Sequence, residues 1–169
     1  MDSLVDVMVY LIKKYPYKDE LSNARLTKMV YLADWKFALK HGRQITDTNW
    51  VFNNYGPFVR DILNTANQHP DLFTVEDTTN SFGAKKTLIS LLKEEYTHKL
   101  SDDEKEILDY VINTTKDLNW DKFIQLVYST FPILTSERYS ELDLIKLAQE
   151  KKSLAGQAKV QAAQAATKL

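Results

Sequence analysis

The chain has 169 residues, a length at which a single domain buries a sizeable core without disulfides or metals. Hydrophobic residues make up 44% of the sequence and charged residues 27%, which excludes a largely disordered chain. The formal net charge is −1, so the total charge gives no general attraction to nucleic acid or to anionic membranes. We therefore expect neither DNA binding nor membrane binding.

Cysteine is absent, which excludes disulfides, thiolate catalysis and cysteine-rich zinc sites. The chain begins MDSLVDVMVYLIKKYP, where an acidic start and interrupted apolar residues resemble neither a signal peptide nor a membrane span. A chain without cysteine also suits a reducing compartment. We therefore expect a cytoplasmic protein.

Two helices are predicted before residue 42. Apolar residues recur on one helical face over residues 4–12, and Pro16 ends that segment. Over residues 24–40 the apolar side chains cover a broader arc, which indicates a helix buried on more than one side. We expect this helix to lie at the centre of the domain. Gly42 follows it and suits the left-handed conformation that commonly ends a helix.

The stretch NNYGPFVRD, residues 53–61, lies where the pattern changes. Residues 50–52, WVF, predict a short strand. Pro57 restricts Gly56 to extended or positive-φ conformations, and glycine enters the second kind at low cost. A helix is predicted from Phe58 to about Asn67, and Pro57 can serve as its first residue.

The next segment predicts a β-hairpin. Residues 72–75 and 86–91 have the composition of strands, and the polar loop EDTTNSFGAK lies between them. Because this loop is long, we expect a loose hairpin rather than a tight one.

Helical patterns return after the hairpin. Ser101 and Glu104 have the spacing of a capping box, in which each side chain bonds the backbone of the other residue. Asn119 is a suitable cap for the next helix, which is expected to end near Pro132. The inner face of that helix is predicted to comprise Trp120, Phe123, Ile124 and Val127.

A further helix is expected to begin at about Ser136 or Ser140 and to continue into the tail. Its inner residues are predicted to be Leu142, Ile145 and Ala148. Residues 151–169 are rich in alanine, glutamine and lysine, which favours a frayed helix or a disordered end over a segment that orders on a partner. We divide the chain into a domain of residues 1–150 and this tail. The elements predict a predominantly helical α+β fold, with five to seven helices around the central buried helix and a small antiparallel β-sheet or hairpin.

Motifs that carry chemistry are missing from the sequence. His41, His69 and His98 lie in unrelated contexts, and neither a phosphate loop nor a Gly-x-Ser-x-Gly turn is present. We expect no enzyme activity, no catalytic residue, no metal and no cofactor. The competing hypothesis is an enzyme site assembled from distant residues, which would require a polar pocket of His41, Arg43 and Asp47 near Tyr55.

Three segments carry a family resemblance: LTKMVYLAD at residues 26–34, GRQIT at residues 42–46 and YGP at residues 55–57. In this order, and followed by two capped helices, they resemble the SocA-like antitoxin family, also called the Panacea domain. The structural positions of the resemblance are Leu26, Tyr31, Leu32, Gly42, Gly56 and Pro57. Gln44 stands where this family often has proline, which predicts a less rigid loop. Tyr128 and Ser129 stand where a threonine–histidine pair is common.

The resemblance implies a function by contact. Members resemble antitoxins that neutralise a protein toxin by binding it directly, which requires no catalytic group. One branch is similar to an adaptor that delivers its toxin to a ClpXP-type protease, and this is the main alternative. A protein-interaction module of a phage or mobile element is a further one.

The candidate partner-binding residues are Trp50, Phe52, Tyr55, Phe58 and Arg43, because aromatic and arginine side chains commonly anchor interfaces. For Tyr55 the favoured interpretation is packing over the central helix with a hydrogen bond to a loop, and the alternative is a place at the toxin interface. Arg43 is expected to brace its loop through backbone carbonyls, with contact to an acidic toxin group as the alternative. Tyr31 and Trp35 are expected in the core.

Overall fold

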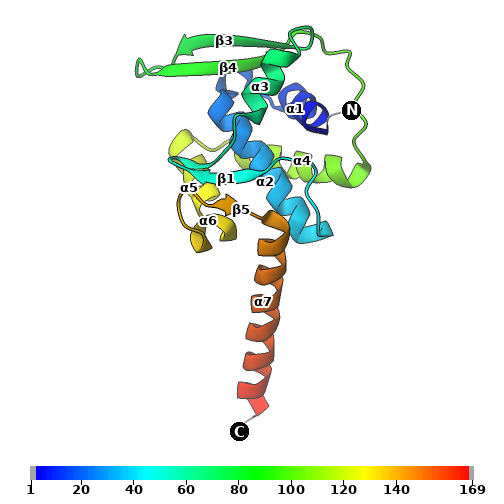
Figure 1. Ribbon diagram of the computed structural model, residues 1–169, viewed down its shortest axis with the longest axis vertical. Helices are drawn as coiled ribbons and strands as arrows, with labels where there is room; N and C mark the ends of the chain where they lie inside the picture. The colour runs from blue at the N-terminus through cyan, green and yellow to red at the C-terminus, as the bar shows by residue number, and fades with distance from the viewer. Residues whose placement is uncertain (1–2, 168–169) are drawn as a thin grey trace.

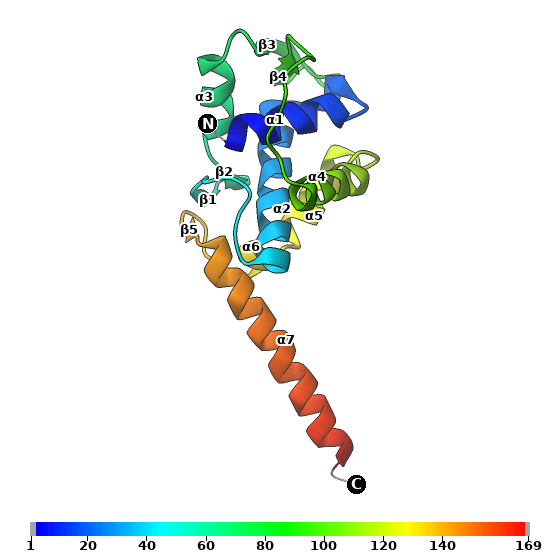
Figure 2. The same cartoon turned by 90° about the vertical axis from the view of Figure 1, so that its right-hand side faces the viewer.

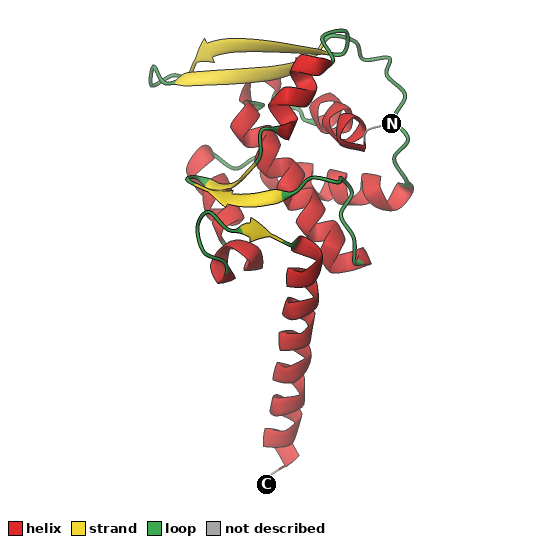
Figure 3. Cartoon of the chain, viewed as in Figure 1, coloured by secondary structure: helices red, strands yellow, loops and turns green. Residues whose placement is uncertain are grey.

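The computed structural model describes residues 3–167, which form a predominantly helical α+β fold (Figures 1 and 3). The α-helices are α1 (Ser3–Lys14), α2 (Asn23–His41), α3 (Asp61–Gln68), α4 (Asp102–Thr115), α5 (Trp120–Tyr128), α6 (Phe131–Thr135) and α7 (Leu144–Thr167). The strands are β1 (Trp50–Asn53), β2 (Gly56–Phe58), β3 (Phe73–Thr79), β4 (Lys85–Leu91) and β5 (Glu141–Leu142), and a short 3-10 helix, η1, covers Lys18–Glu20. The predicted fold class is confirmed.

Helix α2 runs through the middle of the body, as Figures 1 and 2 show. Ser22 caps its start, because the side chain of Ser22 accepts a hydrogen bond from the backbone N–H of Arg25. Gly42 ends it at a φ of 74°, as the sequence predicts. Its buried apolar residues are Leu26, Met29, Val30, Tyr31, Leu32, Ala33, Trp35, Phe37 and Ala38. The helix is therefore buried on more than one side, and the expected core positions of Tyr31 and Trp35 are confirmed.

A three-stranded antiparallel sheet lies beside α2, in the order β2-β1-β5. Val51 pairs with Phe58, and Trp50 pairs with Leu142. The predicted helix start at Phe58 or Pro57 is wrong, because residues 56–58 pair with β1 and α3 begins only at Asp61. Proline is tolerated there because β2 is an edge strand.

The hairpin of β3 and β4 pairs over seven residues on each strand. Its turn comprises residues 80–84, where the side chain of Asn80 accepts hydrogen bonds from the backbone N–H groups of Phe82 and Ala84. The expectation of a loose hairpin is therefore wrong. A single asparagine closes the turn, and it lets the strands extend further into the polar segment than the apolar pattern indicates.

The capped helices begin where the sequence places them. Ser101 and Glu104 form a capping box at the start of α4, and the side chain of Asn119 accepts a hydrogen bond from the backbone N–H of Lys122 in α5. Helix α5 ends at Tyr128, and the segment that includes Pro132 forms the separate helix α6.

In the last part of the chain, the start of the final helix and the burial of Ile145 differ from the prediction. Residues 141–142 form β5, so the final helix begins at Leu144 rather than near Ser136 or Ser140. Leu144 and Ala148 are buried against the body, whereas Ile145 is partly exposed. From there α7 continues as a helix to Thr167 and extends away from the body (Figures 1 and 2). A contact between this tail and a partner stays a prediction.

Candidate functional site

The loop of residues 42–49 is fastened to α2 by the buried carboxylate of Asp34. Asp34 accepts hydrogen bonds from the backbone N–H groups of Ile45 and Thr46, at 3.0 and 2.9 Å. It also accepts from the Thr46 hydroxyl at 2.5 Å and from the Trp50 indole at 2.9 Å. Burial raises the pKa of Asp34 to about 6, although these hydrogen bonds act in the opposite direction. The GRQIT motif is thus anchored to the central helix by Asp34, and we call this set of hydrogen bonds the Asp34 clamp.

Gln44 and Arg43 contribute to the same loop. The Gln44 side chain donates hydrogen bonds to the carbonyl oxygens of Thr46 and Thr48, at 3.1 and 2.9 Å, so it braces the loop for which the sequence predicts less rigidity. The Arg43 guanidinium donates to the carbonyl oxygen of Gln44 at 3.2 Å and lies 3.7 Å from the carboxylate of Glu104. The bracing role expected for Arg43 is therefore present. Its partner-binding role stays a prediction.

Two of the five candidate partner-binding residues lie in the core. The Trp50 ring packs edge-on against Tyr31, with 5.6 Å between ring centroids, and Phe52 packs edge-on against Tyr128 at 6.2 Å. Both Trp50 and Phe52 are buried, so neither has surface to offer a partner in this conformation. Their partner-binding role stays a prediction that would require the sheet to move.

Tyr55 is the most informative candidate. Its side chain is 80% exposed, so the favoured interpretation, packing over the central helix, is wrong. Tyr55 and the half-buried Phe58 instead line a surface pocket of about 320 Å³ with Lys28 and Trp120. The remaining lining residues are Ala24, Asn53 and Asn54.

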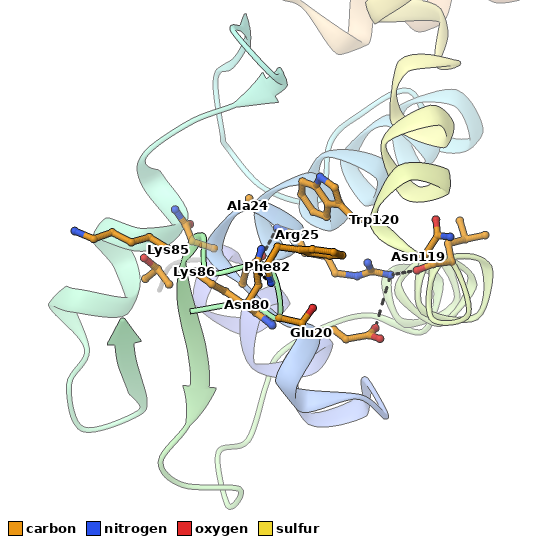
Figure 4. Close-up of a pocket in the computed structure, with 14 residues that line it drawn as sticks. Glu20, Ala24, Arg25, Asn80, Phe82, Lys85, Lys86, Asn119 and Trp120 are labelled. Atoms are coloured by element: carbon orange, nitrogen blue, oxygen red, sulfur yellow. Dashed lines mark hydrogen bonds and ion pairs between the residues drawn. The ribbon is translucent and has the colours of Figure 1, made fainter. Parts of the chain in front are cut away.

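A second pocket, of about 580 Å³, adjoins the first, since Ala24 and Trp120 line both. Figure 4 shows side chains converging on it from the β3–β4 turn, from the start of α2 and from the start of α5. Phe82, in the hairpin turn, is 93% exposed, and Trp120 is 44% exposed. We call Tyr55, Phe58, Phe82 and Trp120, with the two pockets between them, the aromatic face.

Sequence reasoning misses two members of this face. The helical pattern places Trp120 on the inner side of α5, but Trp120 is the first residue of that helix and is partly exposed. Phe82 carries a usable signal, because a large aromatic side chain in a turn of asparagine, serine and glycine has no local structural purpose.

Arg25 fixes the position of Trp120. Its guanidinium is buried and donates hydrogen bonds to the carbonyl oxygens of Thr115 and Leu118, at 2.8 and 3.0 Å. These carbonyls belong to the end of α4 and the connection that leads into α5. The guanidinium also lies 4.5 Å from the ring centroid of Phe123. Through these contacts α2 holds the start of α5, and hence Trp120, in place.

Charged side chains surround the second pocket. Arg25, Lys85 and Lys86 line it together with a single acid, Glu20. Lys28 adds a further cation in the first pocket. The aromatic face is therefore basic, although the whole chain is nearly neutral.

The residues of the hypothetical enzyme site are distributed differently. Asp47 lines a separate pocket with Asp61 and Gln68, whereas the His41 ring packs against Phe37 with 4.4 Å between centroids. Within residues 3–167, no three His, Cys, Asp or Glu side chains are grouped as a metal site would require. In the same range no helix is both long enough and apolar enough to span a membrane.

Comparison with known protein families matches residues 26–131 to the family described as antitoxin SocA-like, Panacea domain. No match is found among curated proteins or among solved structures. The matched segment covers more than half of the chain and contains the Asp34 clamp and all four residues of the aromatic face. The chain therefore belongs to the SocA-like antitoxin family.

Proposed function

We propose that this protein is an antitoxin that neutralises a protein toxin by binding it through the aromatic face. The observation that supports the proposal best is the clustering of exposed Tyr55, Phe82 and Trp120 around two adjoining pockets. Large exposed aromatic side chains grouped on one surface are typical of protein interfaces. Neutralisation then requires only that the toxin's working surface be covered.

Hydrogen bonds within the chain hold the backbone beneath the aromatic face. Asn80 closes the hairpin turn that carries Phe82, and Asn119 caps the helix that begins with Trp120. Arg25 joins the start of α5 to the central helix. A preorganised surface loses little conformational entropy on binding, which favours high affinity.

The charge of the face indicates the kind of partner. Arg25, Lys85 and Lys86 outnumber Glu20 around the larger pocket. We infer that the toxin presents an acidic surface, because complementary charge accelerates association and excludes wrong partners. The proposal places both proteins in the cytoplasm.

The proposal is tested by co-expressing this protein with the product of the neighbouring gene in a host that the product kills. Tyr55→Ala, Phe82→Ala and Trp120→Ala should each weaken binding at least tenfold in calorimetry, and the triple variant should lose rescue. Tyr110→Ala is the matched control, because Tyr110 is a half-exposed tyrosine on α4 outside the face. Circular dichroism establishes that each variant is folded. Full rescue by the triple variant, or a neighbouring product that is harmless alone, would contradict the proposal.

The second candidate function is that of an adaptor that delivers the toxin to a ClpXP-type protease. The observation in its favour is α7, which continues far beyond the body with exposed side chains over residues 151–165. The test is rescue in a host that lacks the protease. Rescue that survives supports simple inhibition, and rescue that disappears supports the adaptor.

A further inference from the structure

Lys28 is a buried lysine at the base of the aromatic face. It lies one helical turn after Ala24 on α2, and its side chain is only 2% exposed. Lysine is almost never fully buried in proteins unless its charge is paired. Lys28 nevertheless lines the 320 Å³ pocket beside Tyr55, Phe58 and Trp120.

The ammonium group of Lys28 has no ionic partner within the described part of the chain. The structure gives this ammonium neither a hydrogen bond nor an ion pair, and the centroid of the Phe58 ring lies 5.7 Å from it. Burial lowers the pKa of Lys28 to about 8, which leaves it mostly charged at neutral pH. The fold therefore keeps a charge without a protein partner in a largely apolar pocket, where the loss of most of its hydration opposes stability.

The pocket itself suggests what would compensate that charge. Its other lining residues are three aromatic side chains, one alanine and two asparagines, and none of them is acidic. One buried cation matches one monovalent anion. Walls of this kind also favour an anion attached to an apolar group over a strongly hydrated one such as phosphate.

We propose that this pocket binds a carboxylate that the toxin carries beside an apolar side chain. Lys28 pairs with the carboxylate, while Tyr55, Phe58 and Trp120 contact the neighbouring apolar group. The assignment of the carboxylate to a toxin rests on the proposed function, whereas the chemistry of the ligand rests on the pocket alone. Pairing on binding converts a destabilising charge into a specific contact.

The ligand chemistry is tested without any toxin. Protein with isotope-labelled lysine is titrated with 3-phenylpropionate and with its neutral counterpart 3-phenylpropanamide, while NMR follows the Lys28 side chain and the Trp120 indole. The acid should produce saturable shifts in both signals, and the amide should bind at least tenfold more weakly. Equal binding of acid and amide, no shift at Lys28, or tighter binding of inorganic phosphate would overturn the proposal.

Two short peptides separate the possible sources of the carboxylate. Acetyl-Phe-Glu-Ala amide offers a side-chain carboxylate, and acetyl-Ala-Phe offers a terminal one. Binding of either peptide supports the pocket and shows which kind of carboxylate it prefers. Failure of both peptides to shift the Lys28 signal contradicts it.

A substitution distinguishes this role from a structural one. Lys28→Met keeps the apolar stem and removes the charge, so it should raise Tm while it weakens toxin binding at least tenfold. Lys122→Met, at an exposed position on α5, should change neither. A Lys28→Met variant with lower Tm and unchanged affinity would show that Lys28 serves the fold alone. If the protein bound carboxylates but did not rescue cells from the toxin, the proposal for the pocket would stand and the proposed function would be refuted.

Discussion

Gly56 lies directly against the ring of Tyr128, and a Cβ at position 56 would lie only 3.3 Å from Cε2 of that tyrosine. The φ angle of Gly56 is 99°, in the region that favours glycine. Tyr128 also packs edge-on against Phe52. The YGP corner therefore joins the sheet to the end of α5, and its glycine is required both by conformation and by space.

Gly56→Ala should lower the free energy of unfolding by about 1–3 kcal/mol, since it adds backbone strain and a close contact. Urea denaturation measures the change. Gly42→Ala is the matched control, because Gly42 also has a positive φ but a Cβ at position 42 would meet no atom within 4 Å. Gly42→Ala should lower the free energy of unfolding less than Gly56→Ala, because it adds backbone strain but no close contact. Equal losses for the two variants would mean that Tyr128 shifts freely.

Asp34→Asn should destabilise the fold at pH 7 by about 1–3 kcal/mol. An asparagine at this position would present its NH₂ group to the donors of Trp50 or Thr46, which now bond to a carboxylate. Thermal unfolding monitored by circular dichroism is the measurement. An unchanged Tm would contradict the assignment of Asp34 as the clamp of the 42–49 loop.

The same carboxyl group makes stability depend on pH. Its pKa is about 6 in the folded protein against an ordinary value of 3.8, so the folded state binds more protons between these values. The free energy of unfolding should therefore fall as pH rises from about 4 to 6, by up to about 3 kcal/mol. The difference between wild type and Asp34→Asn isolates this contribution. A difference that stays flat over this range would refute it.

Arg25→Met should lower stability by about 2 kcal/mol or more, because two carbonyl oxygens lose their donors. It should also change the fluorescence of Trp120, because the start of α5 loses its hydrogen bonds to α2. Arg25→Lys should recover only part of the loss, since an ammonium lacks the planar fork of the guanidinium. Arg60→Met, at an exposed arginine before α3, is the control and should have little effect.

A chain shortened to residues 1–150 should unfold with nearly the same Tm as the full chain, because side chains 151–165 are exposed. Its helical signal should fall in proportion to the residues removed. Leu144→Ala, by contrast, should cost about 2–4 kcal/mol, since this residue is fully buried. A large loss of Tm on truncation would contradict the division of the chain at residue 150.

The elements that sequence analysis places well depend on chemistry within a few residues. Gly42 ends α2, the Ser101–Glu104 pair begins α4, and Asn119 begins α5, in each case through a bond or a conformation local to the helix end. Such signals require no knowledge of the rest of the fold.

The misplaced elements depend on distant partners. Pro57 is acceptable both as the first residue of a helix and in an edge strand, and only pairing with β1 selects the strand. The 141–142 segment likewise becomes a strand because it pairs with Trp50 and Val51, which lie far earlier in the chain. No local pattern carries that information.

The site is only partly predictable for the same reason. The sequence identifies Tyr55 and Phe58, but Phe82 and Trp120 join them only because the hairpin and α5 both meet the start of α2. Lys28 escapes sequence reasoning because a lysine inside an apolar stripe normally extends its charge into water. Here its side chain ends in a pocket instead.

The protruding part of α7 extends well beyond the body of the molecule (Figure 1). Residues 151–167 span about 25 Å as a helix, roughly the width of a small domain. A protein that bound the far part of this helix would have room beside a toxin bound to the body. If both partners bound at once, the length of this helix, more than its sequence, would set the distance between them.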